Sequence, residues 1–147
     1  MANDEKIPFT REENDAHLRG VGRRESLEYL ILGRQYSEQH IQEMMERKNR
    51  YYQQFIRSMT PADVVPGGRE LLLEIGQRGI KTAIASISKN SHTVLEHLGL
   101  IPLFDGIADG WCVVNGKPAP DIFVYAAGMV GVGTVNLNGK PPKSRTV

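Results

Sequence analysis

The sequence contains a single cysteine, Cys112, so neither an internal disulfide nor a cysteine-based zinc cluster can form. It also lacks any run of roughly 18 apolar residues, the length that a membrane-spanning helix needs, and its polar start is unlike a secretory signal. Lys and Arg number 18 against 17 Asp and Glu, which leaves no strongly basic face for nucleic acid or anionic lipid. These absences favour a cytoplasmic protein whose partner is a small molecule, with neither nucleic acid nor membrane as a partner.

The length of 147 residues suits one ordinary domain or a small domain with an added subdomain. Turn-forming residues at Thr60–Asp63 and Pro66–Gly68 mark a boundary between a helical region and an α/β region. We expect a helical subdomain over residues 1–62 and an α/β part over residues 63–130. Residues 131–147 lose apolar periodicity and gain glycine, proline and basic side chains, so an irregular tail is expected there.

Three helices are predicted in the first region. Thr10 and Glu13 match a capping box, which predicts a helix from there to about Arg19, ended by Gly20. A second helix is expected from about Arg24. The third and longest spans roughly Glu38 to Met59, because apolar residues recur there every three or four positions; its stripe consists of Ile41, Met44, Met45, Tyr52, Phe55, Ile56 and Met59.

Lys48 falls on the apolar stripe of the third predicted helix, where a core residue would be expected. One interpretation is that its alkyl stem covers apolar surface while its ammonium reaches water. The other is that it faces a cleft and meets an anion or a hydroxyl. The pattern alone favours the first interpretation.

Helices and strands alternate in the second region, which indicates parallel βα units. Glycines end several of these segments, and Pro118 and Pro120 stiffen the approach to the last helix. The predicted elements are a helix over Gly68–Gln77, a strand over Ile80–Ala85, a helix from Ser91 to about Leu98, a strand over Phe104–Ala108 and a helix from Asp121 to about Val130.

The stretch from Gly79 to Asn90 concentrates polar side chains where a parallel strand ends. In open α/β sheets, ligands bind at the carboxyl ends of the strands, where a following helix attracts anions. Lys117 is presented at a later strand-to-helix loop, a suitable position for contacting phosphate. The sequence therefore predicts phosphate chemistry at this edge of the sheet.

Motifs in both regions resemble those of a known family. ASISKN, which contains Ser86, and GKPAPDIF, which contains Lys117, are similar to motifs two and three of the haloacid dehalogenase superfamily of phosphotransferases. LRGVGRRESL from Leu18 and ERKN from Glu46 resemble the helical cap of the β-phosphoglucomutase family. The resemblance covers about Ile7 to Met129. It implies an α/β fold, an incomplete haloacid dehalogenase-like Rossmannoid core with a helical cap subdomain.

The resemblance implies a role for individual residues. Ser86 and Lys117 would hold the phosphoryl group being transferred, with the ammonium also neutralising charge. Arg23, Ser88 and Asn90 would hold the second phosphate of a bisphosphorylated sugar, a task that suits a guanidinium fork. The other substrate-binding residues that it implies are Gly20, Val21, Ser26, Lys48 and Lys89. For Lys48, the resemblance favours the functional interpretation over the snorkelling one.

The implied activity interconverts β-D-glucose 1-phosphate and D-glucose 6-phosphate through the 1,6-bisphosphate, with Mg²⁺ as cofactor and a sugar phosphate as partner. The superfamily's nucleophile lies in an Asp-x-Asp-Gly motif, which this sequence lacks. Its later acidic motif would fall in residues 131–147, which contain no Asp or Glu. With no residue predicted to bind metal, we expect an interior fragment that is inactive by itself.

A further expectation concerns the sheet edge. In the superfamily the strand that would carry the nucleophile pairs with the strand at Ile80–Ala85, so this edge is expected to be open and to promote self-association. Two alternatives to a phosphomutase therefore remain. The first is a non-catalytic sugar-phosphate binder, and the second is a structural fragment without a ligand.

Two other features of the sequence favour structural roles. The four histidines are scattered over predicted helices, so solvent or capping roles are favoured over metal binding. Trp111 and Cys112 precede the Lys117 motif. A buried anchor or a loop-packing residue is favoured there over a thiol nucleophile, because no base is nearby in sequence.

Overall fold

The structure, a computed structural model, describes residues 4–18 and 20–132 and divides into two compact units, Met1–Ser58 (unit 1) and Met59–Val147 (unit 2). The predicted helix end at Arg19 and most of the predicted tail lie outside the described residues. None of the helices in the described part combines the length and the apolar character needed to cross a membrane.

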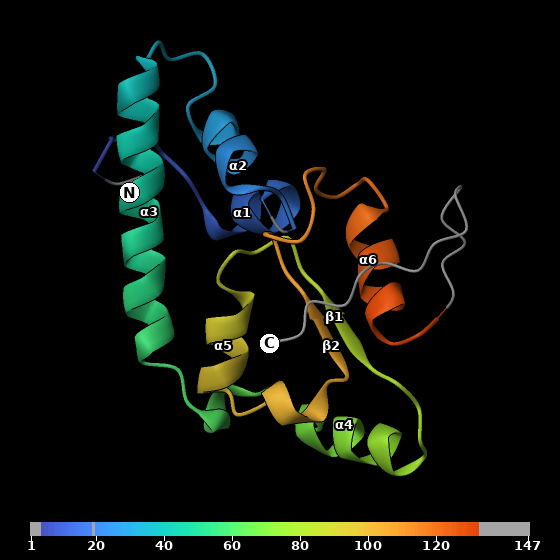
Figure 1. The fold of residues 1–147 in the computed structure, drawn as a ribbon. Coiled ribbons are helices and arrows are strands. Elements are labelled where there is room, and N and C mark those ends of the chain that lie inside the picture. Colours follow the sequence, from blue (N-terminus) through green and yellow to red (C-terminus); the bar gives the residue numbers. More distant parts are fainter. Residues whose placement is uncertain (1–3, 19, 133–147) are drawn as a thin grey trace, which may run out of the picture. The chain divides into compact units, whose positions relative to one another are not determined.

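Unit 1 consists of three helices, α1 (Arg11–His17), α2 (Arg23–Leu30) and α3 (Glu38–Arg57), shown in Figure 1. The predicted capping box at the start of α1 is present. Thr10 Oγ1 accepts from the Glu13 N–H at 3.1 Å, and the Glu13 carboxylate accepts from the Thr10 N–H at 2.8 Å. These bonds satisfy helix donors that have no intrahelical partner, which is why the helix begins here.

The core of unit 1 lies between α2 and α3. Leu27 and Met44 are fully buried there, and Ile7 and Ile31 join them. The predicted apolar stripe of α3 is only partly covered, because Tyr52 and Phe55 remain 43% and 65% exposed. The prediction that Tyr52 is a core residue is therefore wrong within this unit.

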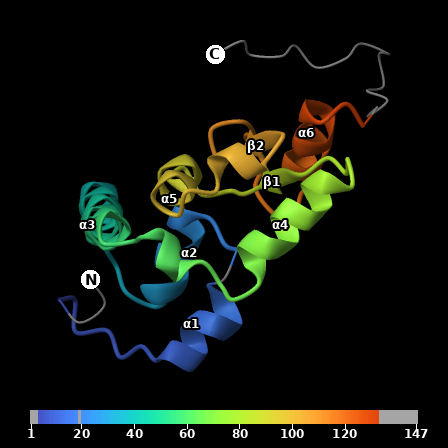
Figure 2. The same cartoon turned by 90° about the horizontal axis from the view of Figure 1, so that it is seen from below.

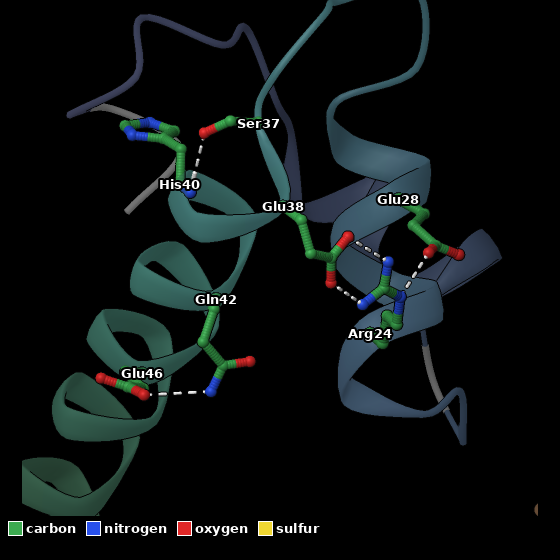
Figure 3. Close-up of polar contacts among 7 residues, drawn as sticks. All are labelled: Arg24, Glu28, Ser37, Glu38, His40, Gln42 and Glu46. Atoms are coloured by element: carbon green, nitrogen blue, oxygen red, sulfur yellow. Dashed lines mark hydrogen bonds and ion pairs between the residues drawn. The ribbon is translucent and has the colours of Figure 1, made fainter.

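Polar contacts also join the helices of unit 1 (Figure 3). Arg24 of α2 donates to Glu28 one turn later and, through two guanidinium nitrogens, to Glu38 at the start of α3. These carboxylates raise the pKa of Arg24, Glu38 more than Glu28. Ser37 caps α3 by accepting from the His40 N–H at 3.2 Å. The ion pairs of Arg24 are half-exposed, so they contribute little to the stability of unit 1. Their main effect is to fix how α2 lies along α3.

The segment before α1 is held against α3. The Glu5 carboxylate, whose side chain is only 13% exposed, is hydrogen-bonded to Arg47 and lies 3.5 Å from His40 Nε2. Tyr51 Oη donates to Asp4 at 3.0 Å. The hydrogen bond from Arg47 is the largest influence on the pKa of Glu5 and lowers it. Desolvation opposes this effect, the contact with His40 adds to it, and the net result is a lowered pKa. Charge pairing thus adds to the burial of Ile7 in fixing this segment.

Unit 2 alternates helices and strands as predicted. Strands β1 (Ala83–Ala85) and β2 (Gly106–Ala108) are parallel, with Ala83 opposite Gly106 and Ala85 opposite Ala108. Figures 1 and 2 show the pair with α5 and α6 on opposite sides. The remaining bounds in unit 2 are η1 (Pro61–Asp63), α4 (Gly68–Gln77), α5 (Ser91–His97), η2 (Ile101–Leu103) and α6 (Asp121–Met129).

Both strands are shorter than the sequence predicts. The prediction began the first strand at Ile80 and the second at Phe104, but the ladder starts at Ala83 and Gly106. Asp105 is the physical reason. Its carboxylate accepts from the Thr82 N–H at 2.9 Å and from Lys81 Nζ at 2.6 Å, so a side chain replaces the ladder bond at this point.

The core of unit 2 lies between the strand pair and α6. Ala108, Ile122 and Ala126 are buried there, and the partly buried Ala83 and Ala85 pack against them. The helix begins immediately after Pro120, with Asp121 in its first turn, where a carboxylate is favourable. This packing fixes the carboxyl end of β1, from which the candidate site extends.

Candidate functional site

A connected set of hydroxyls follows β1. Ser86 Oγ accepts from the Ser88 N–H at 3.1 Å and lies 2.7 Å from Ser91 Oγ. Ser88 Oγ accepts from the Asn90 N–H at 3.2 Å, and Ser91 Oγ lies 2.8 Å from the Ser88 carbonyl oxygen. Three of the predicted site residues, Ser86, Ser88 and Asn90, are therefore joined in one hydrogen-bonded loop, which we call the hydroxyl loop (residues 86–91).

The hydroxyl loop is anchored to both strands. The Ser86 N–H donates to the Ala108 carbonyl oxygen at 2.9 Å, which extends the ladder of β1 and β2 by one bond. The Gly110 N–H, just after β2, donates to the Ser88 carbonyl oxygen at 3.3 Å. A Cβ at Gly110 would lie 2.2 Å from the Ile87 carbonyl oxygen, so only glycine lets the two segments approach this closely.

Lys89 and Lys117 extend from this part of unit 2 in different settings. Lys89 Nζ lies 4.1 Å from the centroid of the Trp111 ring, and Lys117 Nζ lies 4.9 Å from that of Phe123. The peptide bond from Lys117 to Pro118 is cis. Among the residues that the structure describes, no hydrogen bond joins Lys117 to the hydroxyl loop.

In unit 1 a second predicted set gathers where α2 begins. Lys48 Nζ of α3 donates to Ser26 Oγ at 2.6 Å, and Ser26 Oγ donates to the Arg23 carbonyl oxygen at 2.9 Å. Arg23 Nη2 donates to Asn49 Oδ1 at 2.8 Å. Gly20, with φ of +73°, and Val21 form the turn before α2. We call Arg23, Ser26, Lys48 and Asn49 the cationic cluster.

Burial and charge both act on Lys48 in this cluster. Its side chain is half-buried, and desolvation is the larger cause that lowers its pKa; the neighbouring Arg23 charge lowers it further. An anion bound beside these two cations would favour their charged forms. The ammonium donates to the hydroxyl of Ser26, which is itself 3% exposed, so the snorkelling interpretation does not describe its position.

The resemblance implies a bound Mg²⁺ ion. Mg²⁺ takes oxygen ligands, usually including carboxylates. Within residues 4–18 and 20–132 no three His, Cys, Asp or Glu side chains gather closely enough to hold a metal ion. Asp109, just after β2, instead accepts from the Trp111 N–H at 2.9 Å. The described residues do not fit a magnesium site.

Several residues that shape the site were not among the predicted ones. Ser91 joins Ser86 to Ser88, Gly110 contacts the Ser88 carbonyl oxygen, and Asn49 holds Arg23. Of the two alternatives for Trp111, the buried anchor is wrong, because this residue is 69% exposed, and its indole instead contacts the Lys89 carbonyl oxygen, as a loop-packing residue would. Cys112 packs against the core. The Asp109-Gly110 pair after a strand was the available signal for a tight turn.

Comparison with known proteins gives consistent matches. A family model described as haloacid dehalogenase-like hydrolase matches residues 1–140. The beta-phosphoglucomutase of Bacillus subtilis (strain 168) is 42% identical over 136 residues, which cover 90% of this chain and 60% of the relative. A beta-phosphoglucomutase of Mycobacterium bovis is 34% identical over 90 residues, covering 58% of this chain and 34% of the relative.

The fold is also similar to that of a solved structure, again a beta-phosphoglucomutase. The crystal structure of the beta-phosphoglucomutase from Clostridium difficile superimposes with a TM-score of 0.81 at 36% identity, covering 89% of this chain and 60% of that one. The chain thus spans about 60% of the length of these two relatives. The resemblance and the α/β fold class predicted from the motifs are confirmed.

Proposed function

Because the chain belongs to the haloacid dehalogenase-like hydrolase family, we propose that it binds a sugar phosphate of the β-phosphoglucomutase reaction and that it is inactive by itself, since it has no Asp-x-Asp-Gly motif. The reaction interconverts β-D-glucose 1-phosphate and D-glucose 6-phosphate through the 1,6-bisphosphate. Enzymes of this kind generally use Mg²⁺. The single observation that carries the proposal is the hydroxyl loop at the carboxyl end of β1, within the segment that matches the relatives.

The bonding of Ser86 supports its role as a donor. A serine oxygen has two lone pairs and one proton. The Ser88 N–H donates to Ser86 Oγ, and the single Ser91 proton has two acceptors within reach, the Ser88 carbonyl oxygen and Ser86 Oγ. When the Ser91 proton goes to the carbonyl oxygen, the Ser86 hydroxyl is the donor to Ser91 Oγ. A phosphoryl oxygen would replace Ser91 as the acceptor of the Ser86 proton.

The other predicted residues supply charge and further donors. The Lys117 ammonium would neutralise negative charge on the phosphoryl group in transfer, a contribution that grows as charge develops in the transition state. Ser88 and Asn90 would donate to the second phosphate of the bisphosphate, as would Lys89 of the same loop. In unit 1, Arg23 offers a planar fork to phosphate oxygens, while Gly20, Val21, Ser26 and Lys48 would contact the sugar phosphate.

Calorimetric titration of the 147-residue chain with glucose 6-phosphate tests the proposal. Saturable binding is expected, with unphosphorylated glucose binding at least about tenfold more weakly, because charged hydrogen bonds contribute about 1.5–3 kcal/mol. Ser86→Ala and Lys117→Met should each weaken binding by a similar factor. Thr93→Ala, an exposed hydroxyl on α5, and Lys81→Met, at the opposite end of β1, serve as matched controls. Equal affinity for glucose and its phosphate would refute the proposal.

A second candidate, a structural chain that self-associates, is favoured by one observation. Within the described residues β1 pairs with β2 alone, and the apolar residues Ala83–Ala85 are only partly buried. An unpaired apolar edge promotes strand addition. Sedimentation over a concentration series would show a rising average mass if this edge pairs with another copy, and a constant monomer mass would exclude it.

A further inference from the structure

Trp111 is the one tryptophan of the sequence, and its side chain is 69% exposed yet bound to the hydroxyl loop. The indole Nε1 donates to the Lys89 carbonyl oxygen at 3.3 Å, and the Lys89 ammonium lies 4.1 Å from the ring centroid. An indole that served only the core would be buried. Here its polar edge and its π-face both contact one residue of the candidate site.

We propose that Trp111 is a positioning residue, which fixes the backbone of the hydroxyl loop and thereby sets how tightly this loop holds a phosphate. The inference rests on the proposed function of that loop.

The turn that carries Trp111 is held by two hydrogen bonds of Asp109. Asp109 Oδ1 accepts from the Trp111 N–H at 2.9 Å, and the Cys112 N–H donates to the Asp109 carbonyl oxygen at 3.0 Å. The turn follows β2 directly, and β2 is paired with β1. The indole and the hydroxyl loop therefore both follow directly from the same pair of strands, so the indole can act as a fixed support for the loop.

The same turn also holds the backbone of the hydroxyl loop. This turn binds two successive carbonyl oxygens, that of Ser88 through the Gly110 N–H and that of Lys89 through Trp111 Nε1. In a planar trans peptide the C=O and the following N–H point in opposite directions. Holding these two carbonyls therefore directs the N–H groups of Lys89 and Asn90 away from the turn. The Asn90 N–H in fact meets Ser88 Oγ, so the indole bond helps set the serine hydroxyls in place.

The Lys89 side chain places its ammonium over the indole ring. A cation over an exposed aromatic ring is held only weakly. The ring keeps the ammonium beside the loop while leaving it available to an anion. A phosphate that draws Lys89 off the ring would change the emission of the one tryptophan, which makes fluorescence a direct readout.

The test compares two substitutions in the 147-residue chain. Trp111→Phe keeps a ring for Lys89 but removes the indole donor, and Trp111→Leu removes both. Val114→Ala, at a side chain 99% exposed, is the control. Without ligand, Trp111→Phe should speed amide hydrogen exchange at Ser88 and Asn90 by about fivefold, the equivalent of one net hydrogen bond, and leave α6 unchanged.

The same variants are then titrated with glucose 6-phosphate. Trp111→Phe should lower affinity by about fivefold and Trp111→Leu by more, as the second lacks both contacts. Unchanged loop exchange and unchanged affinity in Trp111→Phe, or acceleration spread equally over unit 2, would overturn the positioning role. If the wild-type chain fails to bind while exchange changes only in the loop, the proposed function fails and the positioning of the loop stands.

Discussion

Replacing Gly110 by alanine tests whether the close approach of the two strand ends shapes the phosphate loop. The new Cβ would lie 2.2 Å from the Ile87 carbonyl oxygen, 2.9 Å from its carbonyl carbon and 3.2 Å from Lys89 Cγ. Since such contacts essentially never fall below 3.0 Å, the backbones must separate by about 0.8 Å. The two nearest atoms, the carbonyl oxygen and carbon of Ile87, belong to backbone, so side-chain rotation alone cannot absorb the shift.

The expected consequence is larger for binding than for folding. Overpacking of this kind costs about 1–3 kcal/mol of stability. A displacement approaching 1 Å in groups that must meet a ligand together can cost about 10²-fold in function. The bond of the Gly110 N–H to the Ser88 carbonyl oxygen, 3.3 Å in length, is also lost or stretched. We therefore expect Gly110→Ala to weaken glucose 6-phosphate binding by at least about tenfold while unit 2 still unfolds cooperatively.

The measurement pairs urea denaturation with calorimetric titration for Gly110→Ala and a matched control. In Gly116→Ala the added Cβ would lie 3.8 Å from Ile87 Cγ2, an ordinary contact with the same residue. This control should keep wild-type affinity. If Gly110→Ala also kept wild-type affinity and stability, the close approach would have no role in shaping the loop.

Three further predictions concern Lys48, Glu5 and the helix α4. Replacing Arg23 by Gln should raise the pKa of Lys48 only part of the way to its ordinary value, because burial is the larger cause of the shift. Since folding lowers this pKa, unit 1 should become more stable as the pH rises from the folded to the unfolded pKa of Lys48. NMR titration of the lysine carbons measures this pKa in the wild-type chain and in the variant. Glu5→Gln should cost about 1–3 kcal/mol at neutral pH by leaving Arg47 without its carboxylate. That cost should shrink in acid, as the lowered pKa of Glu5 is crossed, and an equal cost at all pH values in urea titrations would contradict it. Gly76→Ala, inside α4 with open space around the new Cβ, should stabilise unit 2 by about 0.5–1 kcal/mol, and a lowered denaturation midpoint would count against this.

The helices could be predicted from the sequence because local chemistry sets their ends. Thr10 with Glu13 begins α1, and Gly68 to Gln77 is helical over the range predicted. The strands were overextended because their length depends on a partner. Asp105 ends the ladder by taking the Thr82 N–H, and no pattern within Ile80–Ala85 reveals a carboxylate from another segment. Exposure also depends on partners, which is why the spacing of Phe55 did not predict its 65% exposed side chain.

The residues of the candidate site also differ in whether the sequence could locate them. Ser86, Ser88 and Asn90 are close in sequence, so a single motif located them together. Gly110 and Trp111 reach the same loop only because β1 and β2 are paired, and this pairing is a tertiary contact. The roles of Lys117, Arg23, Ser26 and Lys48 come from the resemblance and stay predictions.

The central claim is that the hydroxyl loop binds phosphate, and amide NMR during a titration with glucose 6-phosphate tests it most directly. The account predicts saturable shifts concentrated at Ser86, Ser88 and Asn90, a parallel change in Trp111 emission, and no such shifts with glucose. Shifts that leave residues 86–91 unmoved, or that glucose reproduces at the same concentration, would contradict it.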